Sequence, residues 1–396
     1  MSGARVIIES LSSLAAQPDF EQDAEALASV SQLAKQLQLS AQKPADAAIE
    51  LAFHPIFLAT IRVAINLKLF HHIANAQAAI TAAELSQLSG CPENLLLRLL
   101  RPIAALGFVH EAGEGQWSTT PITKVMCAPP IEAAHIHFWD QGTTAAIKMH
   151  QYFEEKGYQQ PEDPRNGLFQ YSHGTEKEAF ELWTSQPDVI TNFNTFMTGN
   201  RGSRPSWIEW YPVEERLLNA DVSLGEEDVL LVDIAGGRGH DVQAFGRKFA
   251  SHKGRLVLED LPPVIADISA LDDRVERVAH DFFTLQPIQG ARIYFFHFIL
   301  HDWSDKVCKD ILSRTIAAMK PGHSKLILNE FILPNQGSTL FHAGFDLHMM
   351  TMHAAQERTE RQWKTLLEGA GLASISFWIP PGGGEGIIEA EVPVGK

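Results

Sequence analysis

Four short apolar runs in the C-terminal half of the chain constrain its fold more than any other feature. They begin near residue 228 and are separated by stretches with helical periodicity: VLLVDIAGG, GRLVLEDLP, ARIYFFHFIL and KLILNEFIL. Each run is rich in β-branched or aromatic residues and is followed by glycine, proline or an acidic residue, as is typical of strands buried on both faces. This alternation predicts an α/β domain built around a parallel sheet.

The first run leads into LLVDIAGGRGHDVQAFGRKF, which predicts a strand, a glycine turn and a helix. Gly236, Gly237 and Gly239 allow a sharp turn and a close approach of a ligand to the backbone, and the helix that follows offers free N–H donors. The spacing is not GxGxxG, and Asp233 lies near the end of the strand. We therefore expect a cofactor with an ammonium group rather than a pyrophosphate, the alternative being a glycine turn of purely topological origin.

Two further segments carry groups suited to a nucleoside. The segment LVLEDLPPVI ends the second run about 20 residues after the glycines, where a carboxylate can reach ribose hydroxyls. Asp260, which precedes Leu261, is the candidate there, and Glu259 is its rival. In HDFF, Asp281 and Phe282 are candidates for contacts with an adenine amino group and ring face. The sequence therefore predicts cofactor contacts after three successive strands.

The N-terminal part of the chain has a helical pattern. Residues 1 to about 45 have the periodicity of helices that pack on another surface, and 48–73 predicts one helix buried on most sides, plausibly against a partner subunit. Between 80 and 120 the pattern indicates helix, turn, helix and hairpin, which is a winged helix-turn-helix. Winged helices often bind DNA, but the expected second helix is mostly leucine, so we favour a dimer-forming role.

Composition narrows the class of protein. The net charge is −16, and no Lys/Arg-rich run occurs, which argues against nucleic-acid binding. Cys91, Cys127 and Cys308 are far apart and lack metal-site spacing, so neither a disulfide framework nor a zinc site is expected. The N-terminus lacks a basic secretory pattern, and no window of about 18 apolar residues occurs. We expect a soluble, cytoplasmic protein without membrane contact.

Residues 130–215 are helical in pattern and rich in aromatic and histidine residues, as in HIHFWDQG and NGLFQYSHG. Such a region can form a lid or wall over a ligand pocket. Ordinary core packing of Phe and Trp is the alternative for most of these side chains.

The ordered segments GGRGHDVQAF, LVLEDLPPVI, HDFF, ILHDWSD, LNEFILP and DLHMMTMHAAQERTERQW resemble the class I S-adenosylmethionine-dependent O-methyltransferases of the caffeate/flavonoid type, and most closely their fungal secondary-metabolite relatives. The likeness covers roughly residues 45–390. It implies a homodimer with an N-terminal helical, winged-helix dimerisation domain (1–125), a helical linker and lid (126–215) and a Rossmann-like methyltransferase domain (216–396) with a seven-stranded sheet.

The resemblance also implies the catalytic residues. The base of the family is the His of HDW, which is His301 here, and Glu330 and Glu357 are the acids that flank it. Imidazole titrates near neutral pH and can take the proton of a phenol or enol while its oxygen attacks the methyl group. Each residue could instead have a purely structural role. His301 could pair with a neighbouring acid, Glu330 could accept a backbone N–H, and Glu357 could cap a helix.

The substrate residues expected from this resemblance lie beside the base and on FDLHMMTMH, where helical spacing places several side chains along a pocket. They are Asp302, Asp346 and Met350, and the same segment places His348, Met349 and His353 along the pocket. Methionine adapts to a flat aromatic ligand, although it also serves as ordinary core filler. Imidazole serves as the base and no suitable carboxylate cluster occurs, so no metal is expected.

Some residues depart from the family pattern. Ala235 replaces a usual glycine, and His297, expected near the cofactor, replaces a usual Lys or Arg. His135 and His137 add imidazoles, and Arg201 adds a cation, to the region expected to cap the substrate. A fungal branch of this family uses such groups, with the sulfonium as a fixed charge, for dehydration and pericyclic ring closure of polyketide-derived pyridones.

Two functions are therefore expected. The first is methyl transfer from S-adenosylmethionine to a hydroxyl of a small aromatic or polyketide-derived metabolite, which the retention of His301 and both acids favours. The alternative is a pericyclase or dehydratase that binds the same cofactor and uses His135, His137 and His301 as catalysts.

Overall fold

The computed structural model describes residues 3–202, 205–218, 224–380 and 384–395, apart from a few helical side chains. The chain divides into two compact units: 1–140 with 187–202, and 141–186 with 203–396. The expected lid region contributes to both units, because 126–140 and 187–202 belong to the first. The division of the chain into three domains stays a prediction.

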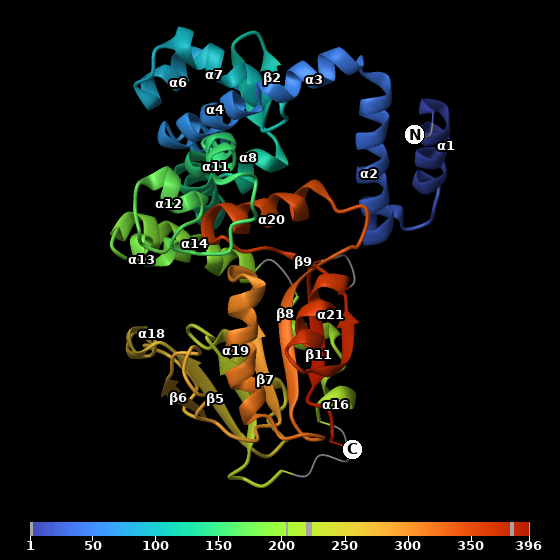
Figure 1. The fold of residues 1–396 in the computed structure, drawn as a ribbon. Helices are drawn as coiled ribbons and strands as arrows, with labels where there is room; N and C mark the ends of the chain where they lie inside the picture. The colour runs from blue at the N-terminus through green and yellow to red at the C-terminus, as the bar shows by residue number, and fades with distance from the viewer. Residues whose placement is uncertain (1–2, 203–204, 219–223, 381–383, 396) are drawn as a thin grey trace. The chain divides into compact units, whose positions relative to one another are not determined.

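The first unit is helical apart from three short strands (Figure 1). Its elements are α1 (Ala4–Ala15), η1 (Phe20–Gln22), α2 (Ala24–Ala41), α3 (Pro44–Ala52), α4 (His54–Asn66), α5 (Leu69–Asn75), β1 (Ile80–Thr81), α6 (Ala82–Ser89), α7 (Glu93–Ala105), β2 (Val109–Gly113), β3 (Gln116–Thr119), α8 (Pro121–Val125), α9 (Pro129–His137) and α14 (Pro187–Gly202). Helices α1 and α2 pack against each other, as do α9 and α14.

The prediction of one helix over 48–73 is wrong. Three helices, α3, α4 and α5, share this segment. Pro55 lies in the first turn of α4 and cannot donate the N–H that a continuous helix would need, and Lys68 enters α5 with a left-handed φ of 53°. In the single chain Ile49, Leu51 and Ile56 are each at least 60% exposed, so the expected burial of this segment against a partner subunit stays a prediction.

The winged-helix expectation is confirmed. Helices α6 and α7 are joined at Gly90, whose φ of 72° ends α6, and the hairpin β2–β3 follows α7. Strand β1 pairs antiparallel with β3, which completes a three-stranded sheet in the order β1-β3-β2. Leucines of α7, including the fully buried Leu96 and Leu100, pack in the core of this unit.

The second unit contains the predicted α/β domain. The π-helix η2 (Phe138–Thr143) leads into it from the first unit. Its further elements are α10 (Thr144–Ala146), α11 (Met149–Lys156), α12 (Leu168–His173), α13 (Ala179–Thr184), α15 (Trp207–Trp210), α16 (Val213–Arg216), β4 (Val229–Ile234), α17 (His240–Lys248), β5 (Arg255–Asp260), α18 (Pro262–Ala266), β6 (Val275–Ala279), β7 (Ile293–His297), η3 (Leu300–Asp302), α19 (Asp305–Ala318), β8 (Lys325–Leu333), α20 (Leu340–His353), β9 (Arg358–Thr359), α21 (Glu360–Gly369), β10 (Ala373–Trp378) and β11 (Glu385–Glu391).

The sheet has the strand order β10-β11-β8-β7-β4-β5-β6, and the short strand β9 pairs with β8. Strands β8, β7, β4, β5 and β6 are parallel, and β11 runs antiparallel to β8 and β10. The four apolar runs are β4, β5, β7 and β8, so the predicted parallel sheet is confirmed. Because the parallel strands end at the same edge, the residues after them meet there.

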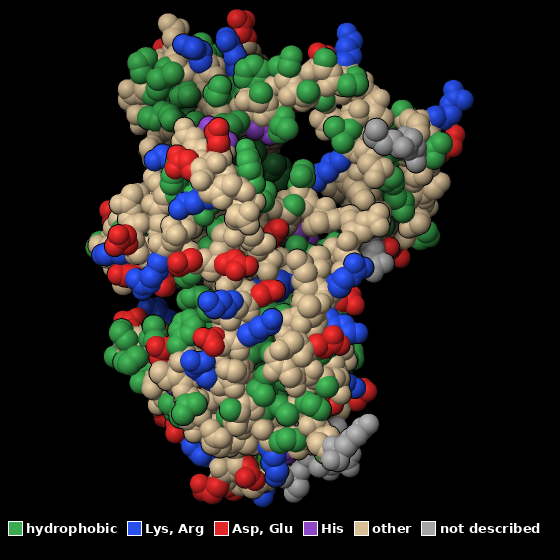
Figure 2. All heavy atoms as spheres, viewed as in Figure 1, with side chains coloured by type: hydrophobic (Ala, Val, Ile, Leu, Met, Phe, Trp, Pro, Cys, Tyr) green, Lys and Arg blue, Asp and Glu red, His purple; other side chains and the backbone are tan. Residues whose placement is uncertain are grey.

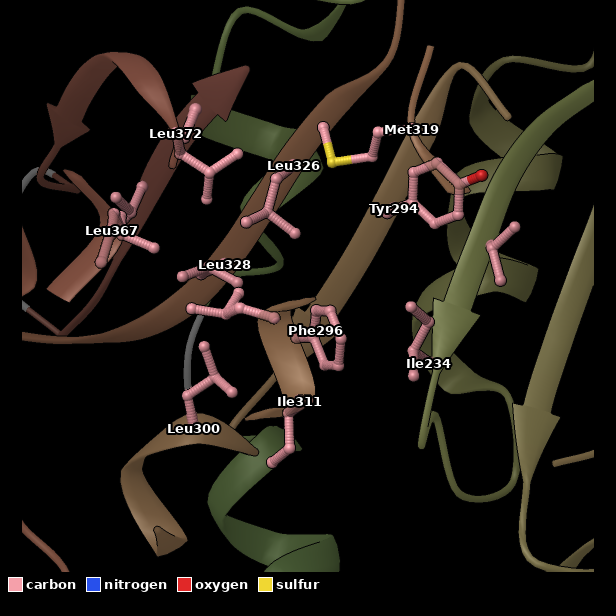
Figure 3. Close-up of a cluster of buried hydrophobic side chains, with 14 of the residues drawn as sticks. Ile234, Tyr294, Phe296, Leu300, Ile311, Met319, Leu326, Leu328, Leu367 and Leu372 are labelled. Atoms are coloured by element: carbon pink, nitrogen blue, oxygen red, sulfur yellow. The ribbon is translucent and has the colours of Figure 1, made fainter. Parts of the chain in front are cut away.

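Apolar layers cover both faces of this sheet. On one face, α19 and α21 pack on the strands (Figure 1). On the other face, α15, α16 and α17 do so. Figure 3 shows Leu300, the residue before the expected base, within the first cluster near Phe296 and Ile311. Burial of Leu300 therefore anchors the loop that carries His301.

The surface of the described residues carries both signs of charge. Lys/Arg and Asp/Glu side chains are intermingled on the face drawn in Figure 2. Among the described helices, none is by itself long and apolar enough to span a membrane, and only α3 and α4, bent by 45°, meet that test as a pair.

Candidate active site

The glycine turn after β4 has the sharp bend that the sequence predicted. Ala235, Gly237 and Gly239 have φ values of 57°, 62° and 77°. A Cβ at Gly236 would lie 2.4 Å from the carboxyl carbon of Asp233, whereas a Cβ at Gly237 would meet nothing within 4 Å. The turn is thus closed toward the core and open at Gly237. Ala235 adopts the left-handed conformation in place of the usual glycine.

Asp233 lies beneath this turn. Its carboxylate is fully buried, and Oδ2 accepts the backbone N–H of Val242 in α17 at 3.2 Å. This bond ties the start of the helix to the strand. The hydrogen bond from Val242 to Asp233 therefore stabilises the conformation of the turn.

Asp260 and its rival Glu259 have different surroundings. Asp260 ends β5, and its Oδ2 accepts the N–H of Gly237 at 2.8 Å while Oδ1 accepts the N–H of Leu261 at 2.7 Å. Glu259 is fully buried and accepts from Nε2 of Gln286 at 2.9 Å. Burial raises the pKa of Glu259 to about 7. Asp260 is therefore the carboxylate at the ligand edge, next to the half-exposed Leu261.

The HDFF segment follows β6 at the same edge. Asp281 is exposed and accepts the N–H of Phe283 at 2.9 Å. The Phe282 ring packs edge-on to Trp303, with centroids 6.2 Å apart. Strand β6 lies beside β5, so Asp281 and Asp260 follow neighbouring strands.

These features fit a nucleoside with a positive charge. The carboxylates of Asp260 and Asp281 can accept hydrogen bonds from hydroxyl or amino groups, and they would repel a phosphate. The open side of Gly237 leaves room for a ligand against the backbone. His297, at the end of β7, hydrogen-bonds through Nδ1 to Oδ2 of Asp241 at 2.9 Å. His297 thus lies beside the first turn of α17, at the position where the family usually has the longer side chain of Lys or Arg.

His301 and Glu357 form a direct contact in the second unit. Nδ1 of His301 lies 2.8 Å from Oε1 of Glu357, and Nε2 lies 3.5 Å from Oδ1 of Asp302. The imidazole also stacks on Phe298 with centroids 5.0 Å apart. The loop Phe298–Asp302 follows β7, so the ring lies near the carboxyl edge of the sheet, and Phe298 itself has a φ of 52°.

The acids around His301 control its charge. Burial on its own would lower the pKa of His301. The negative charges of Glu357, Asp302 and Glu330 together outweigh burial, with Glu357 the largest of the three, and raise the pKa of His301 to about 10. Burial likewise raises the pKa of Asp302, to about 6. Without a ligand, the imidazole is therefore protonated at neutral pH.

Glu330 supports the loop rather than the imidazole ring. Its Oε1 accepts the N–H groups of Ile299 and Leu300 at 3.1 and 2.9 Å. Burial raises the pKa of Glu330 to about 7. Among the described residues, no hydrogen bond joins Glu330 to His301, so Glu330 influences His301 through its charge and through the backbone of the loop.

Helix α20 supplies the expected substrate residues. Oδ1 of Asp346 accepts the N–H of Glu357 at 2.9 Å, which fixes the residue beside His301, and Met350 is half-buried. His353, which ends α20, stacks on Phe180 with centroids 5.1 Å apart. Its Nε2 lies 4.0 Å from Oδ1 of Asp302, so the carboxylate of Asp302 has an imidazole on either side.

The other expected substrate residues belong to the first unit. His137 is buried among aromatic rings, with Phe193 and Phe138 at centroid distances of 5.4 and 6.0 Å. Burial lowers the pKa of His137 to about 4 and also lowers that of His135. Arg201 lies in the last turn of α14, and its side chain is outside the described residues.

Of two further residues near His301, the sequence placed His353 along the expected pocket, whereas it did not single out Arg358. His353 lies on the FDLHMMTMH segment at helical spacing from Asp346 and Met350, and that spacing was a usable signal. Arg358 directly follows Glu357 and is fully buried beneath the loop that carries His301. The only sequence feature that points to Arg358 is its position directly after Glu357.

Comparisons with known proteins agree with this geometry. Residues 158–373 match the O-methyltransferase domain family, and residues 49–129 match the O-methyltransferase dimerisation domain family. The O-methyltransferase penC of Penicillium thymicola is 38% identical over 388 residues, which covers 97% of this chain and 96% of that protein.

Two solved structures resemble the chain over almost its full length. A structure described as LepI in complex with SAM has a TM-score of 0.85 at 27% identity and covers 97% of this chain and 98% of that chain. A structure described as a pericyclic reaction enzyme has a TM-score of 0.84 at 27% identity and covers 98% of both chains.

Proposed function

The chain belongs to the O-methyltransferase family, and on that premise we propose that it transfers a methyl group from S-adenosylmethionine to a hydroxyl of a small aromatic or polyketide-derived metabolite. One observation carries the proposal. An imidazole, held by a carboxylate through Nδ1, lies on the loop after β7, near the edge where the glycine turn and Asp260 form a nucleoside-compatible site.

The cofactor would be held by the residues at the carboxyl edge of the sheet. Gly237 leaves space for close approach, Asp260 and Asp281 offer carboxylates to hydroxyl and amino groups, and Leu261 and Phe282 offer apolar surface. When bound, S-adenosylmethionine supplies a methyl group on a positively charged sulfur. The acidic groups at this edge suit that charge.

His301 performs the proton transfer in this proposal. Glu357 fixes the imidazole through Nδ1, which leaves Nε2 to take the proton of the acceptor hydroxyl as its oxygen gains the methyl group. Glu357 also stabilises the imidazolium that results, as carboxylates beside catalytic histidines do. Asp302 lies 3.5 Å from Nε2 and would therefore also be near the proton that Nε2 takes up.

The base must be neutral when the acceptor binds. The three carboxylates keep His301 protonated without ligand, since they raise its pKa to about 10. A positive charge bound at the same sheet edge disfavours the imidazolium and so lowers this pKa. The carboxylates and a cationic cofactor thus shift the pKa of His301 in opposite directions.

Aromatic rings around the base support a flat acceptor. Phe298 stacks on His301, and the buried Phe331 packs against Phe298 with a centroid distance of 5.3 Å, so the rings form an aromatic cluster beside the imidazole. Rings of α20, including Phe345 at 5.4 Å from Phe331, extend it further. Rings prefer such offset or tilted contacts with other rings.

We also propose that the protein is a homodimer. The dimerisation domain match covers the end of α3 and all of α4, whose exposed Leu51 and Ile56 leave apolar surface for a partner. The cytoplasmic location expected from the sequence stays a prediction.

The experiment for methyl transfer uses S-adenosylmethionine with a labelled methyl group and a panel of phenols and enols. Formation of S-adenosylhomocysteine in equal amount to a labelled, methylated product supports the proposal. Intact cofactor, together with a substrate that isomerises or loses water, contradicts it.

A pericyclase or dehydratase is the second candidate. The high pKa of His301 favours it, because an imidazolium can donate a hydrogen bond to an oxygen that gains charge. The similar structure described as a pericyclic reaction enzyme adds support. His137 is a weaker catalyst for this role than the sequence suggested, since burial lowers its pKa to about 4.

A further inference from the structure

Arg358 makes an unusual set of contacts for a fully buried cation. Nη1 donates to the carbonyl oxygen of Leu300 at 3.0 Å, and Nη2 donates to that of Trp303 at 2.7 Å. Nε donates to Oδ1 of Asp305 at 2.8 Å. The guanidinium lies over the ring of Trp363, 4.9 Å from its centroid. Each nitrogen of the guanidinium thus has an acceptor, as a buried charge requires.

The two carbonyls lie on either side of His301 in the chain. On the opposite side of the same loop, Glu330 accepts the N–H groups of Ile299 and Leu300. The loop is therefore fixed through its N–H groups by strand β8 and through its carbonyl groups by strand β9. Strand β9 is itself held to β8 by pairing of Arg358 with Ile332.

Arg358 is also bonded in sequence to Glu357, the residue that contacts Nδ1 of His301. One dipeptide therefore fixes both members of the contact: Glu357 directly, and His301 through the backbone on either side of it. A shift of this dipeptide would change the 2.8 Å separation between Nδ1 and Oε1.

We propose that Arg358 is a positioning residue for His301, which holds the imidazole against Glu357 by fixing the carbonyl groups of Leu300 and Trp303. The inference rests on the proposed function only in treating His301 as the base. The planar fork of arginine can donate in three directions at once, whereas a lysine has one compact ammonium group. Lysine at 358 would keep the charge but release part of the loop.

Arg292 provides a matched control in the same unit. It is also buried, and it donates from Nε to the carbonyl oxygen of Leu217 at 2.7 Å and from Nη1 to that of His323. Among the described residues, neither of these partners belongs to the His301 loop. R292K should therefore reproduce the general cost of altering a buried arginine without altering the base.

The test is the titration of His301 in the full chain, followed by NMR with 15N-labelled histidine, with H301N to assign the signal. In R358K the pKa of His301 should fall by about one pH unit or more, because the Glu357 contact loosens. In R292K it should remain at the value of the unaltered protein. Both variants should lose thermal stability.

An R358K protein that folds and keeps the His301 titration of R292K overturns the inference. If R358K does not fold, the same titration is made on D305A. Asp305 is half-exposed, and its substitution removes the acceptor of the Arg358 Nε–H. A lower pKa of His301 in D305A supports the inference, and an unchanged pKa overturns it. The readout needs no substrate, so a failure here is distinct from a failure to detect methyl transfer.

Discussion

Asp302 lies 3.5 Å from Nε2 of His301, the ring nitrogen that does not contact Glu357. The same carboxylate oxygen lies 4.0 Å from Nε2 of His353. The base is thus flanked by carboxylates at both ring nitrogens. Its reactivity depends on the balance between these charges and the charge of a bound ligand.

Asp302→Asn should shift the pH dependence of methyl transfer toward lower pH. Asp302 raises the pKa of His301, so removal of its charge lets the imidazole lose its proton at a lower pH. The measurement is kcat/KM against pH for an accepted phenol. Asp310→Asn, on the exposed side of α19, is the control and should keep the original profile. An unchanged profile in D302N would exclude Asp302 from control of the base.

Glu357→Gln should reduce kcat by about ten- to a thousandfold and leave cofactor binding intact, because Glu357 orients the imidazole and stabilises its charged form. Single-turnover kinetics and calorimetric binding of S-adenosylhomocysteine separate these effects. Glu368→Gln changes a half-exposed acid of α21 and should leave both values unchanged. A Glu357→Gln enzyme with full activity would show that Glu357 has only a structural role and does not assist His301 in catalysis.

The stability of the second unit should depend on the charge of His301. The folded protein raises the pKa of His301 from 6.5 to about 10, so the stabilisation is complete below pH 6.5 and is lost as the pH rises through 10. The gap in free energy of unfolding between the unaltered protein and H301N should therefore shrink between pH 7 and pH 10 in urea titrations. For His110→Asn, on exposed β2, no such change is expected. A gap for H301N that stays constant with pH contradicts the assigned charge.

Asp260→Asn should weaken binding of S-adenosylmethionine about ten- to a hundredfold, the range expected for hydrogen bonds to a charged group. Glu259→Gln should change affinity little, because Glu259 is buried against Gln286. Asp267→Asn controls for surface charge, since Asp267 is exposed beside Arg238. Calorimetry gives the affinities. A larger loss in E259Q than in D260N would reverse the assignment of the carboxylate.

Much of this architecture follows from the sequence because its signals are local. Apolar runs predicted β4, β5, β7 and β8, and the glycines predicted the turn after β4. The break between α3 and α4 was also encoded, in Pro55, but the strong apolar period over 48–73 masked it. Continuous periodicity does not exclude a bend at a proline in a first turn.

The parts of the site that depend on tertiary contacts could not be predicted. Glu330 has the same residue type as Glu357, yet Glu330 accepts from the loop backbone and Glu357 contacts the ring. The pairing of β8 with β7 positions Glu330, and the pairing of β9 with β8 positions Glu357. Arg358 gave no independent signal, because its partners are backbone carbonyls, which every sequence contains.

The most direct test of the account is methyl transfer by His301→Asn under single-turnover conditions, with cofactor binding measured on the same preparation. The account predicts that H301N binds S-adenosylmethionine as the unaltered protein does but transfers the methyl group about a hundred to ten thousand times more slowly, as loss of a general base does. Transfer within about threefold of the unaltered rate would contradict the assignment of His301 as the base.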